Sequence, residues 1–288
     1  MERLRHPAVA GSFYPAEADD LKELLEECLV SHPLGPQGVK SPSTSLLGGM
    51  VPHAGYSYSG PCAAHFYSSL DRNTGRVIIL GVNHRGWGAK AALSPADYWE
   101  TPLGKVKVDR ELGQLLKARL DFLVEDERPH FEEHSIEVQL PFLQSVLGGF
   151  TFLPVSLSNL SEDECAKLGQ AIAHLYKTEA SSNKKTVLIA SSDLSHYLSP
   201  GETERLDRLA LDEILNLNPV GLLNIVEDED ISMCGVFPTA VFLFAANALG
   251  AKHARLLKHC HSGDAVPMQE VVGYASVGVE LGEEGVKR

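Results

Sequence analysis

Short apolar runs that alternate with helical patterns are the feature of this chain that most restricts its fold. Three of the runs, at 46–51, 76–80 and 186–190, are bounded by turn-forming residues and have the composition of buried parallel strands. Further strands are predicted at 150–157, 254–258 and 271–279, and helices at 21–29, 62–70, 109–120, 132–147, 161–176, 202–215 and 236–249. Pro61 is expected in the first turn of its helix and Pro141 inside its helix. The alternation predicts a single α/β domain over residues 1–288, with a mainly parallel or mixed central sheet and helices on both faces.

Charge and apolar content argue against two classes of partner. The chain carries a formal net charge of −13, and this negative field opposes binding to nucleic acid. No stretch approaches the ~20 apolar residues of a membrane span, and residues 1–20 contain no apolar leader segment. We therefore expect a cytoplasmic protein that binds neither nucleic acid nor membrane. The five cysteines are widely spaced without any CxxC, which opposes a disulfide framework or a structural zinc knuckle.

Histidines follow the three central strands at the same topological position. The first strand leads into His53, the second into His84, and the third into Asp193 and His196. Because ligands of open α/β sheets bind beyond the carboxyl ends of the strands, we expect these loops to meet in one crevice. One such histidine is usually an ordinary loop residue, but the repeated placement favours a site. Histidine and aspartate beside small residues there indicate a metal site or an acid/base site.

Two further segments contain residues of suitable chemistry. His134 and Glu137 stand at i and i+3 near the start of a predicted helix, where they can share a hydrogen bond or a ligand. An acid-rich, capped helix start explains the same residues equally well. Cys234 precedes the predicted helix 236–249, whose dipole favours a thiolate, and a small buried hydrophobic residue is the alternative interpretation. Six histidines lack any such placement and are predicted on the surface or on helix faces: His6, His32, His65, His174, His253 and His259.

A series of motifs resembles the Memo family over nearly the whole chain. Each motif alone is weak, but their order and spacing together are specific. They are AGSFY (10–14), PHAGYSYSG (52–60), CAAHFY (62–67), the run ending at His84, EHSIEVQLP (133–141), SSDLSH (191–196), MCG (233–235), SGD (262–264) and VGYAS (272–276).

The resemblance implies a fold and a set of metal-facing residues. Memo proteins are similar in fold to class III extradiol dioxygenases, which hold non-haem iron with two histidines and a glutamate. Carried over to this chain, the family pattern makes His53, His84 and Cys234 the metal-facing residues, with Asp193 and His196 lining the same pocket. Cysteine thus takes the place of the dioxygenase carboxylate. The resemblance favours iron(II), and because a set of two histidines and one cysteine is softer than the dioxygenase triad, copper or zinc is also admitted.

Three functions remain open on the sequence. The first is a metal-dependent oxidoreductase acting on a small molecule, with His196 as general acid or base, Asp193 orienting it or serving as an extra ligand, and His134 as a further catalytic candidate. The second is a catalytically idle pocket that binds a peptide or phosphopeptide, as in signalling members of the family. Tyr14, Tyr56 and Tyr58 can stack on such a ligand, although packing explains these tyrosines as readily. The third is a metal-assisted hydrolase in which His196 accepts the proton of a zinc-bound water.

Overall fold

A mixed sheet of 12 strands forms the centre of the molecule in the computed structural model, which describes residues 2–38, 43, 45–178 and 185–282. The strands run in the order β1-β5-β6-β8-β3-β9-β2-β12-β10, with β11 paired to β12, β4 paired to β8, and β7 paired to β4. Their bounds are β1 Leu4–Arg5, β2 Leu46–Val51, β3 Thr74–Val82, β4 Ala91–Leu93, β5 Tyr98–Thr101, β6 Gly104–Val108, β7 Val124–Glu125, β8 Thr151–Leu157, β9 Lys185–Ser191, β10 His196–Leu198, β11 Ala251–His261 and β12 Val271–Leu281.

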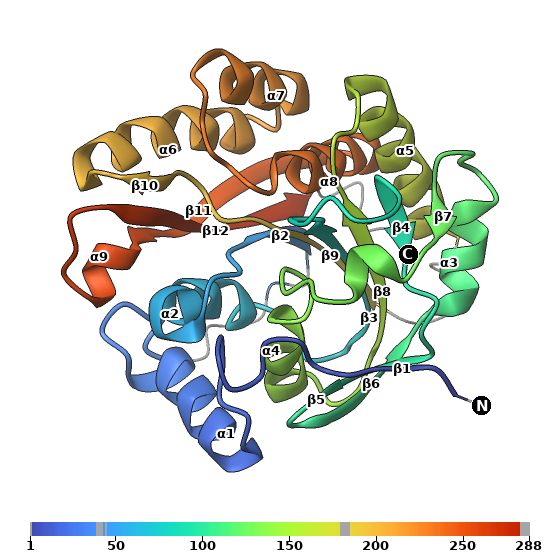
Figure 1. Ribbon diagram of the computed structural model, residues 1–288. Helices are drawn as coiled ribbons and strands as arrows, with labels where there is room; N and C mark the ends of the chain where they lie inside the picture. Colours follow the sequence, from blue (N-terminus) through green and yellow to red (C-terminus); the bar gives the residue numbers. More distant parts are fainter. Residues whose placement is uncertain (1, 39–42, 44, 179–184, 283–288) are drawn as a thin grey trace.

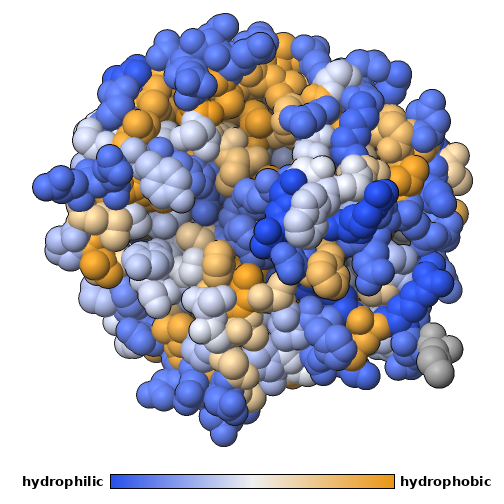
Figure 2. Space-filling view, viewed as in Figure 1, coloured by the Kyte–Doolittle hydropathy of each residue, from blue (hydrophilic) through white to orange (hydrophobic). Residues whose placement is uncertain are grey.

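Helices cover both faces of this sheet (Figure 1). They are α1 Ala18–Glu26, α2 Tyr56–Tyr67, α3 Arg110–Lys117, α4 Gln139–Val146, α5 Glu162–Thr178, α6 Pro200–Leu215, α7 Pro219–Asp228, α8 Val236–Leu249 and α9 Ser262–Ala265, with a π-helical turn η1 Glu27–Ser31 and a 3-10 turn η2 Arg128–His130. In the described part of the chain no helix has the length and apolar content needed to cross a membrane. The surface of the molecule, seen from the direction of Figure 1, shows a mixture of hydrophilic and hydrophobic residues (Figure 2).

Two hydrophobic cores, one on each face, follow from the alternation of side chains along the strands. On β3, Val77 and Ile79 belong to the core shared with α1, α2 and α4, whereas Ile78 and Leu80 belong to the core shared with α3, α5, α6, α7 and α8. Successive side chains of a strand point to opposite faces, so a continuous apolar run is what a strand covered on both faces requires. The predicted α/β class, with a mixed sheet and helices on both faces, is confirmed.

The direction of the central strands brings the loops after them to one edge. Strands β8, β3, β9 and β2 are neighbours and pair in parallel, whereas β12 runs antiparallel to β2. The carboxyl ends of β2, β3 and β9 therefore lie side by side. This is the edge at which ligands of open α/β sheets bind.

The predicted bounds are most accurate for elements that are mainly apolar. Strand β2 and helix α8 have the predicted bounds, and β3, β8, β9, β11 and β12 lie within a few residues of theirs. Short elements were not predicted: β1, β4, β5, β6, β7, β10, α7 and α9. Most of these are too short for their own periodicity to be recognised.

Two predicted helix starts are wrong. Helix α2 begins at Tyr56, directly after the loop of His53, so that Pro61 lies inside the helix and removes one of its backbone hydrogen bonds. Helix α4 begins at Gln139 rather than at 132, which places Pro141 in the first turn, where proline is tolerated. The residues before Gln139 form turns instead, because their carboxylates and hydroxyls bind backbone groups of other loops.

Candidate metal centre

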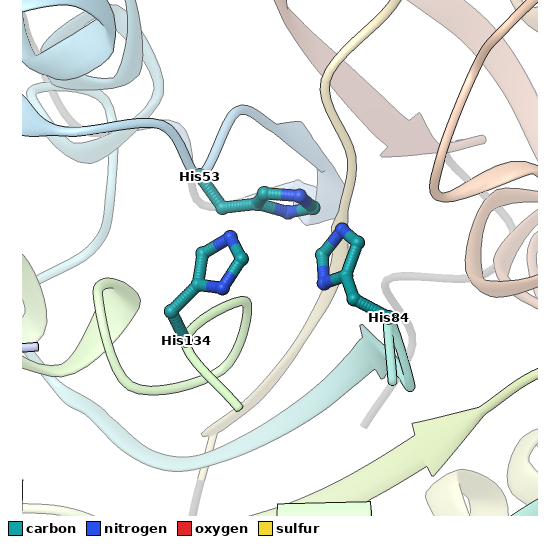
Figure 3. Close-up of side chains that lie close together, drawn as sticks. All are labelled: His53, His84 and His134. Atoms are coloured by element: carbon teal, nitrogen blue, oxygen red, sulfur yellow. The ribbon is translucent and has the colours of Figure 1, made fainter. Parts of the chain in front are cut away.

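Three histidines from separate parts of the chain meet at the carboxyl edge of the sheet. His53 follows β2, His84 follows β3, and His134 lies in the turns between η2 and α4. One ring nitrogen from each lies within 4.8 Å of the other two. The ring centroids are 4.6 Å apart for His84 and His134, 5.1 Å for His53 and His84, and 5.3 Å for His53 and His134, and the rings face a common space (Figure 3). This spacing suits the binding of a single metal ion.

In each of the three histidines the Nδ1 atom lies near a polar side chain, which leaves the Nε2 atom to face a metal ion. The Nδ1 atom of His53 lies 2.8 Å from the hydroxyl of Ser191, and that of His84 lies 2.9 Å from the carboxylate of Glu133. The Nδ1 atom of His134 is 3.5 Å from the same carboxylate. Within the described residues, the Nε2 atoms of His84 and His134 make no hydrogen bond. Metal-binding imidazoles are commonly oriented through their other nitrogen in this manner, so the donor set fits zinc, copper or iron.

Glu133 is the residue that ties two of the histidines together. Its carboxylate, only 3% exposed, accepts the backbone N–H groups of His84 (2.9 Å), His134 (2.8 Å) and Ser135 (2.8 Å). Burial alone would raise the pKa of this carboxyl, but the hydrogen bond and charge of His84, the charge of His134 and the Ser135 N–H hold it at about 2. Glu133 is therefore ionised at neutral pH and fixes the orientation of its neighbours.

The environment keeps two of the imidazoles neutral. Burial holds the pKa of His53 well below its usual value, and the neighbouring imidazoles of His134 and His84 lower it further. Burial also lowers the pKa of His134, to about 4, although the carboxylate of Glu133 acts in the opposite direction. A metal ligand must be deprotonated, so these two rings can bind a metal near neutral pH without first releasing a proton.

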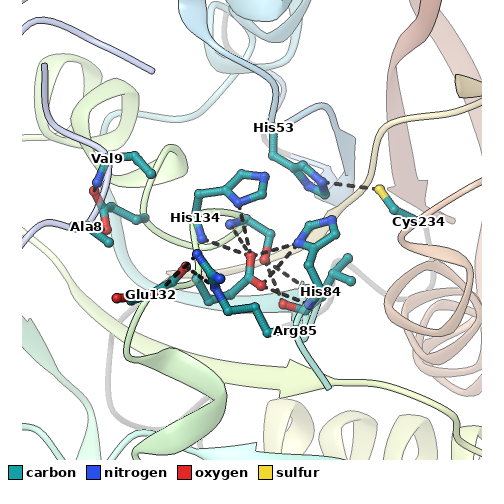
Figure 4. A network of polar contacts seen from close by, with 12 residues as sticks. Ala8, Val9, His53, His84, Arg85, Glu132, His134 and Cys234 are labelled. Carbon is teal, nitrogen blue, oxygen red and sulfur yellow. Dashed lines mark hydrogen bonds and ion pairs between the residues drawn. The ribbon is translucent and has the colours of Figure 1, made fainter. Parts of the chain in front are cut away.

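Cys234 lies beside the histidine group. Its Sγ atom is 3.2 Å from Nε2 of His53 (Figure 4). The same Sγ atom is 3.7 Å from the carbonyl oxygen of Asp193. Burial, followed by the negative charge of Asp193, raises the pKa of the thiol. The thiolate expected from the dipole of α8 is thus not favoured in the metal-free protein, because the loss of hydration outweighs the helix dipole. A cation bound at this position would reverse that balance.

Asp193 and His196 reach the same region with different partners. Asp193 accepts the backbone N–H of His53 at 2.7 Å, and burial raises the pKa of its carboxyl to about 6. Nδ1 of His196 lies 2.7 Å from the carbonyl oxygen of Leu194, to which it donates, and the backbone N–H of His196 donates to Ser232 at 2.8 Å. The carboxylate of Asp193 therefore orients the loop of His53 rather than the ring of His196.

Glu137 does not share a partner with His134, as the i, i+3 spacing suggested. Its fully buried carboxylate forms an ion pair with Arg5 at 2.7 Å and accepts the hydroxyl of Tyr14 at 2.7 Å. It also accepts the backbone N–H groups of residues 8 and 9, at 2.8 and 3.0 Å. Glu137 thus attaches the N-terminal segment to the turns that precede α4.

Two residues of the site were missed on the sequence. Glu133 and Ser191 hold the ring nitrogens of His84 and His53, but nothing in the sequence distinguished Glu133 from its neighbour Glu132. In the structure Glu132 is exposed and pairs with Arg85 at 3.2 Å (Figure 4). A signal was present for Ser191, which directly follows a predicted strand, although serine there is common in ordinary turns.

The tyrosines expected to stack on a peptide are mostly inside the protein. Tyr14 and Tyr56 are 3% and 2% exposed, and the hydroxyl of Tyr56 donates to the carbonyl oxygen of Val138 at 2.5 Å. Only Tyr58, at 39% exposure, presents its ring to solvent. Packing explains the first two tyrosines, so they are not available to a peptide ligand.

Comparison with known proteins decides the family. The family model described as Memo-like protein matches residues 5–278. The chain belongs to the Memo family. Memo relatives include a MEMO1 family protein of Methanopyrus kandleri, 40% identical over 280 residues that cover 95% of this chain and 98% of the relative. MEMO1 family proteins of Sulfolobus acidocaldarius and Ignicoccus hospitalis are 42% and 43% identical, again over 95% of this chain and 98% of each relative. The family predicted from the motifs is confirmed.

Proposed function

We propose that this Memo family member is a metal-dependent oxidoreductase of the class III extradiol dioxygenase type, acting on a small molecule. The observation that carries the proposal is the convergence of His53, His84 and His134 at the carboxyl edge of parallel strands. Iron(II) is favoured, and copper or zinc is compatible with the same imidazoles. Such a metal, when bound, supplies Lewis acidity and electron transfer toward dioxygen and substrate.

The remaining residues of the site have separate tasks in this proposal. Glu133 keeps His84 and His134 in position, and Cys234 provides a soft fourth donor beside His53. Asp193, whose carboxyl has a pKa of about 6, can hold or release a proton close to neutral pH. His196, which lies on β10, is proposed as the general acid or base.

Metal-assisted hydrolysis is the second candidate function. The observation that favours it is the third histidine, because three histidines with an open position are a known ligand set for catalytic zinc. His196 would then accept the proton of the attacking water. The two candidates use the same residues and differ in their need for dioxygen.

The first experiment measures metal binding by protein purified without oxygen. Iron(II) and zinc would be titrated into wild type, His84→Ala, His134→Ala and Cys234→Ser, with His253→Ala, an exposed histidine on β11, as control. We expect about one metal per chain in wild type and control, and a large loss of affinity in both site histidine variants. Wild type without metal affinity, or site variants that bind as well as the control, would contradict the proposal.

The second experiment separates the two chemistries. Oxygen uptake would be followed with a panel of catechols, and ester hydrolysis with a panel of activated esters under nitrogen. We expect oxygen uptake that disappears in His84→Ala but not in His253→Ala. Turnover of esters without oxygen, with no oxygen uptake on any catechol, would favour the hydrolase and contradict the redox proposal.

A further inference from the structure

Residues 191–196, from the last residue of β9 to the first residue of β10, contact both His53 and Cys234 and are called the Asp193 loop below. Asp193 accepts the backbone N–H of His53 through its carboxylate and lies 3.7 Å from Sγ of Cys234 through its carbonyl oxygen. Ser191 contacts the ring of His53. The position of this loop therefore determines how the imidazole and the thiol face each other.

Ser192 of the same loop also contacts Gly235, the residue after Cys234. The hydroxyl of Ser192 accepts the backbone N–H of Gly235 at 3.0 Å. A Cβ atom on Gly235 would come within 2.4 Å of the side chain of Ser192, so the two backbones are in close contact. A shift of the loop would thus be passed to Cys234 as well as to His53.

Three of the hydrogen bonds that hold the Asp193 loop connect it to β12 and α6. Two join it to β12, from the N–H of Leu194 to the carbonyl of Gly273 at 2.9 Å and from the N–H of Gly273 to the carbonyl of Ser195 at 2.8 Å. The third comes from helix α6: the N–H of Ser195 donates to Oδ1 of Asp207 at 2.9 Å. Asp207 is the one charged side chain among these contacts, and it is fully buried.

The second oxygen of Asp207 has a partner on a third element. Oδ2 lies 2.9 Å from Nε2 of His259 on β11, whose side chain is 23% exposed. His259 was predicted as a surface or helix-face residue, and is instead largely buried on a strand. A Cβ atom on Gly273 would lie 1.9 Å from Oδ2, so the absence of a side chain there makes room for the carboxylate. The carboxylate is thus confined by α6, β11 and β12 together.

We propose that Asp207, held by His259, is a positioning residue for the metal centre and acts through the Asp193 loop. Burying a carboxylate costs free energy because its charge is removed from water, and a single N–H group does not require a charged acceptor. The carboxylate of Asp207 instead fixes the position of the loop, since one oxygen binds the N–H of Ser195 and the other contacts His259. The inference rests on the proposed metal site for its metal measurements only, since the position of Cys234 can be measured without metal.

The test compares two pairs of matched variants. Asp207→Asn retains the shape of the side chain and removes its charge, and Asp212→Asn makes the same change at an exposed position of the same helix. His259→Gln removes the imidazole from the pair, and His253→Gln is its exposed counterpart on β11. His259 is partly exposed, so this variant remains informative if Asp207→Asn does not fold.

Two measurements report on the geometry of the metal site and not on the stability of the fold. The first is the affinity and absorption spectrum of bound cobalt(II), which changes with the ligands and their angles. The second is the alkylation rate of Cys234 by iodoacetamide in metal-free protein, followed on its own peptide, since the other four cysteines are buried. For Asp207→Asn we expect about tenfold weaker cobalt binding with an altered spectrum, as is typical when an outer partner of a ligand is removed. We also expect several-fold faster alkylation, and the same changes, smaller, in His259→Gln.

The outcomes separate this inference from the proposed function. Folded Asp207→Asn and His259→Gln with the spectrum, affinity and alkylation rate of their controls would overturn the inference. Wild type that binds no cobalt would contradict the metal site, while the alkylation rates would still decide the role of Asp207. A double-mutant cycle adds a final check: if Asp207 acts through the loop, its effect on alkylation will not add to that of Asp193→Asn, and additive effects would overturn the inference.

Discussion

The two sides of the candidate metal centre are held in different ways. On one side, residues 128–138, called the His134 loop, are attached to the N-terminal segment by the buried guanidinium of Arg5. This group donates to the carbonyl of His130 at 2.7 Å and to that of Glu133 at 2.6 Å, and pairs with Glu137. The charges of Arg5 and Glu137 at the centre of this network are buried, so the His134 loop is part of the core as well as part of the site.

The Asp193 loop on the other side depends on fewer charged contacts. Two backbone hydrogen bonds connect this loop to β12, and a third hydrogen bond connects it to the carboxylate of Asp207. Just after it, Tyr197 has a φ angle of 58°, a conformation uncommon for tyrosine, and its side chain is 72% exposed. This difference predicts that damage to the His134 loop will lower global stability more than changes behind the Asp193 loop, which will mainly alter the site.

Removal of the charge on Glu137 is expected to have the largest effect. In Glu137→Gln the guanidinium of Arg5 remains buried without its counter-ion, which lowers the free energy of unfolding by about 4 kcal/mol. Urea denaturation at neutral pH measures this. The control, Glu132→Gln, removes an exposed ion pair with Arg85 and should change stability by less than about 1 kcal/mol. Equal effects of the two substitutions would show that the buried ion pair of Glu137 stabilises the His134 loop no more than an exposed pair does.

Acid will destabilise the His134 loop through His130. Burial, followed by the charge of Arg5, lowers the pKa of this histidine from 6.5 to about 3 in the folded protein. Between these values the unfolded chain binds a proton that the folded chain does not, so stability falls as pH falls, by about 3 kcal/mol at pH 4. We expect His130→Gln to flatten the acid limb of a stability profile measured from pH 7 to pH 4. His174→Gln, an exposed histidine on α5, should retain the wild-type slope, and a retained slope in His130→Gln would contradict the prediction.

Glu133 connects stability and metal binding on the same side. In Glu133→Gln the amide can accept fewer of the bonds now made to His84, His134 and Ser135. We expect roughly 30-fold weaker binding of iron(II) or zinc, measured by competition with a chromophoric chelator. Glu132→Gln, one residue earlier and exposed, should bind as wild type does. Unchanged affinity in Glu133→Gln would show that the orientation of the rings does not depend on this carboxylate.

The smallest expected effect concerns the strained backbone beside the Asp193 loop. Asparagine adopts positive φ angles more readily than tyrosine, so Tyr197→Asn should raise the free energy of unfolding by about 0.5 kcal/mol. Thermal unfolding of wild type and variant measures the difference. Tyr58→Asn, at an exposed tyrosine inside α2, has no such strain to relieve and should not stabilise the protein. Loss of stability in Tyr197→Asn would mean that the ring of Tyr197 stabilises the folded protein by more than the strain of its backbone destabilises it.

Most of the fold could be predicted where the local pattern was long and uniform. Strand β2 is apolar throughout and helix α8 is apolar over most of its length, and both ends of each were predicted correctly. The start of α4 could not be placed, because the apolar periodicity from 132 onward resembles a helix while Glu133, Ser135 and Glu137 are engaged with other loops. Local preference favoured a helix there, and tertiary hydrogen bonds favoured turns.

The sequence alone was enough to predict the family and the edge of the sheet at which His53 and His84 meet. His53 and His84 follow buried parallel strands, and parallel strands end at one edge, so chain direction alone brings them together. Only the tertiary structure decided which residue joins them. His134 completes the group of three, Cys234 stands beside His53, and Glu133 rather than Glu137 holds the rings. The reason is physical: spacing along a chain specifies which residues share a strand or a helix, but the meeting of separate loops depends on packing across the whole sheet.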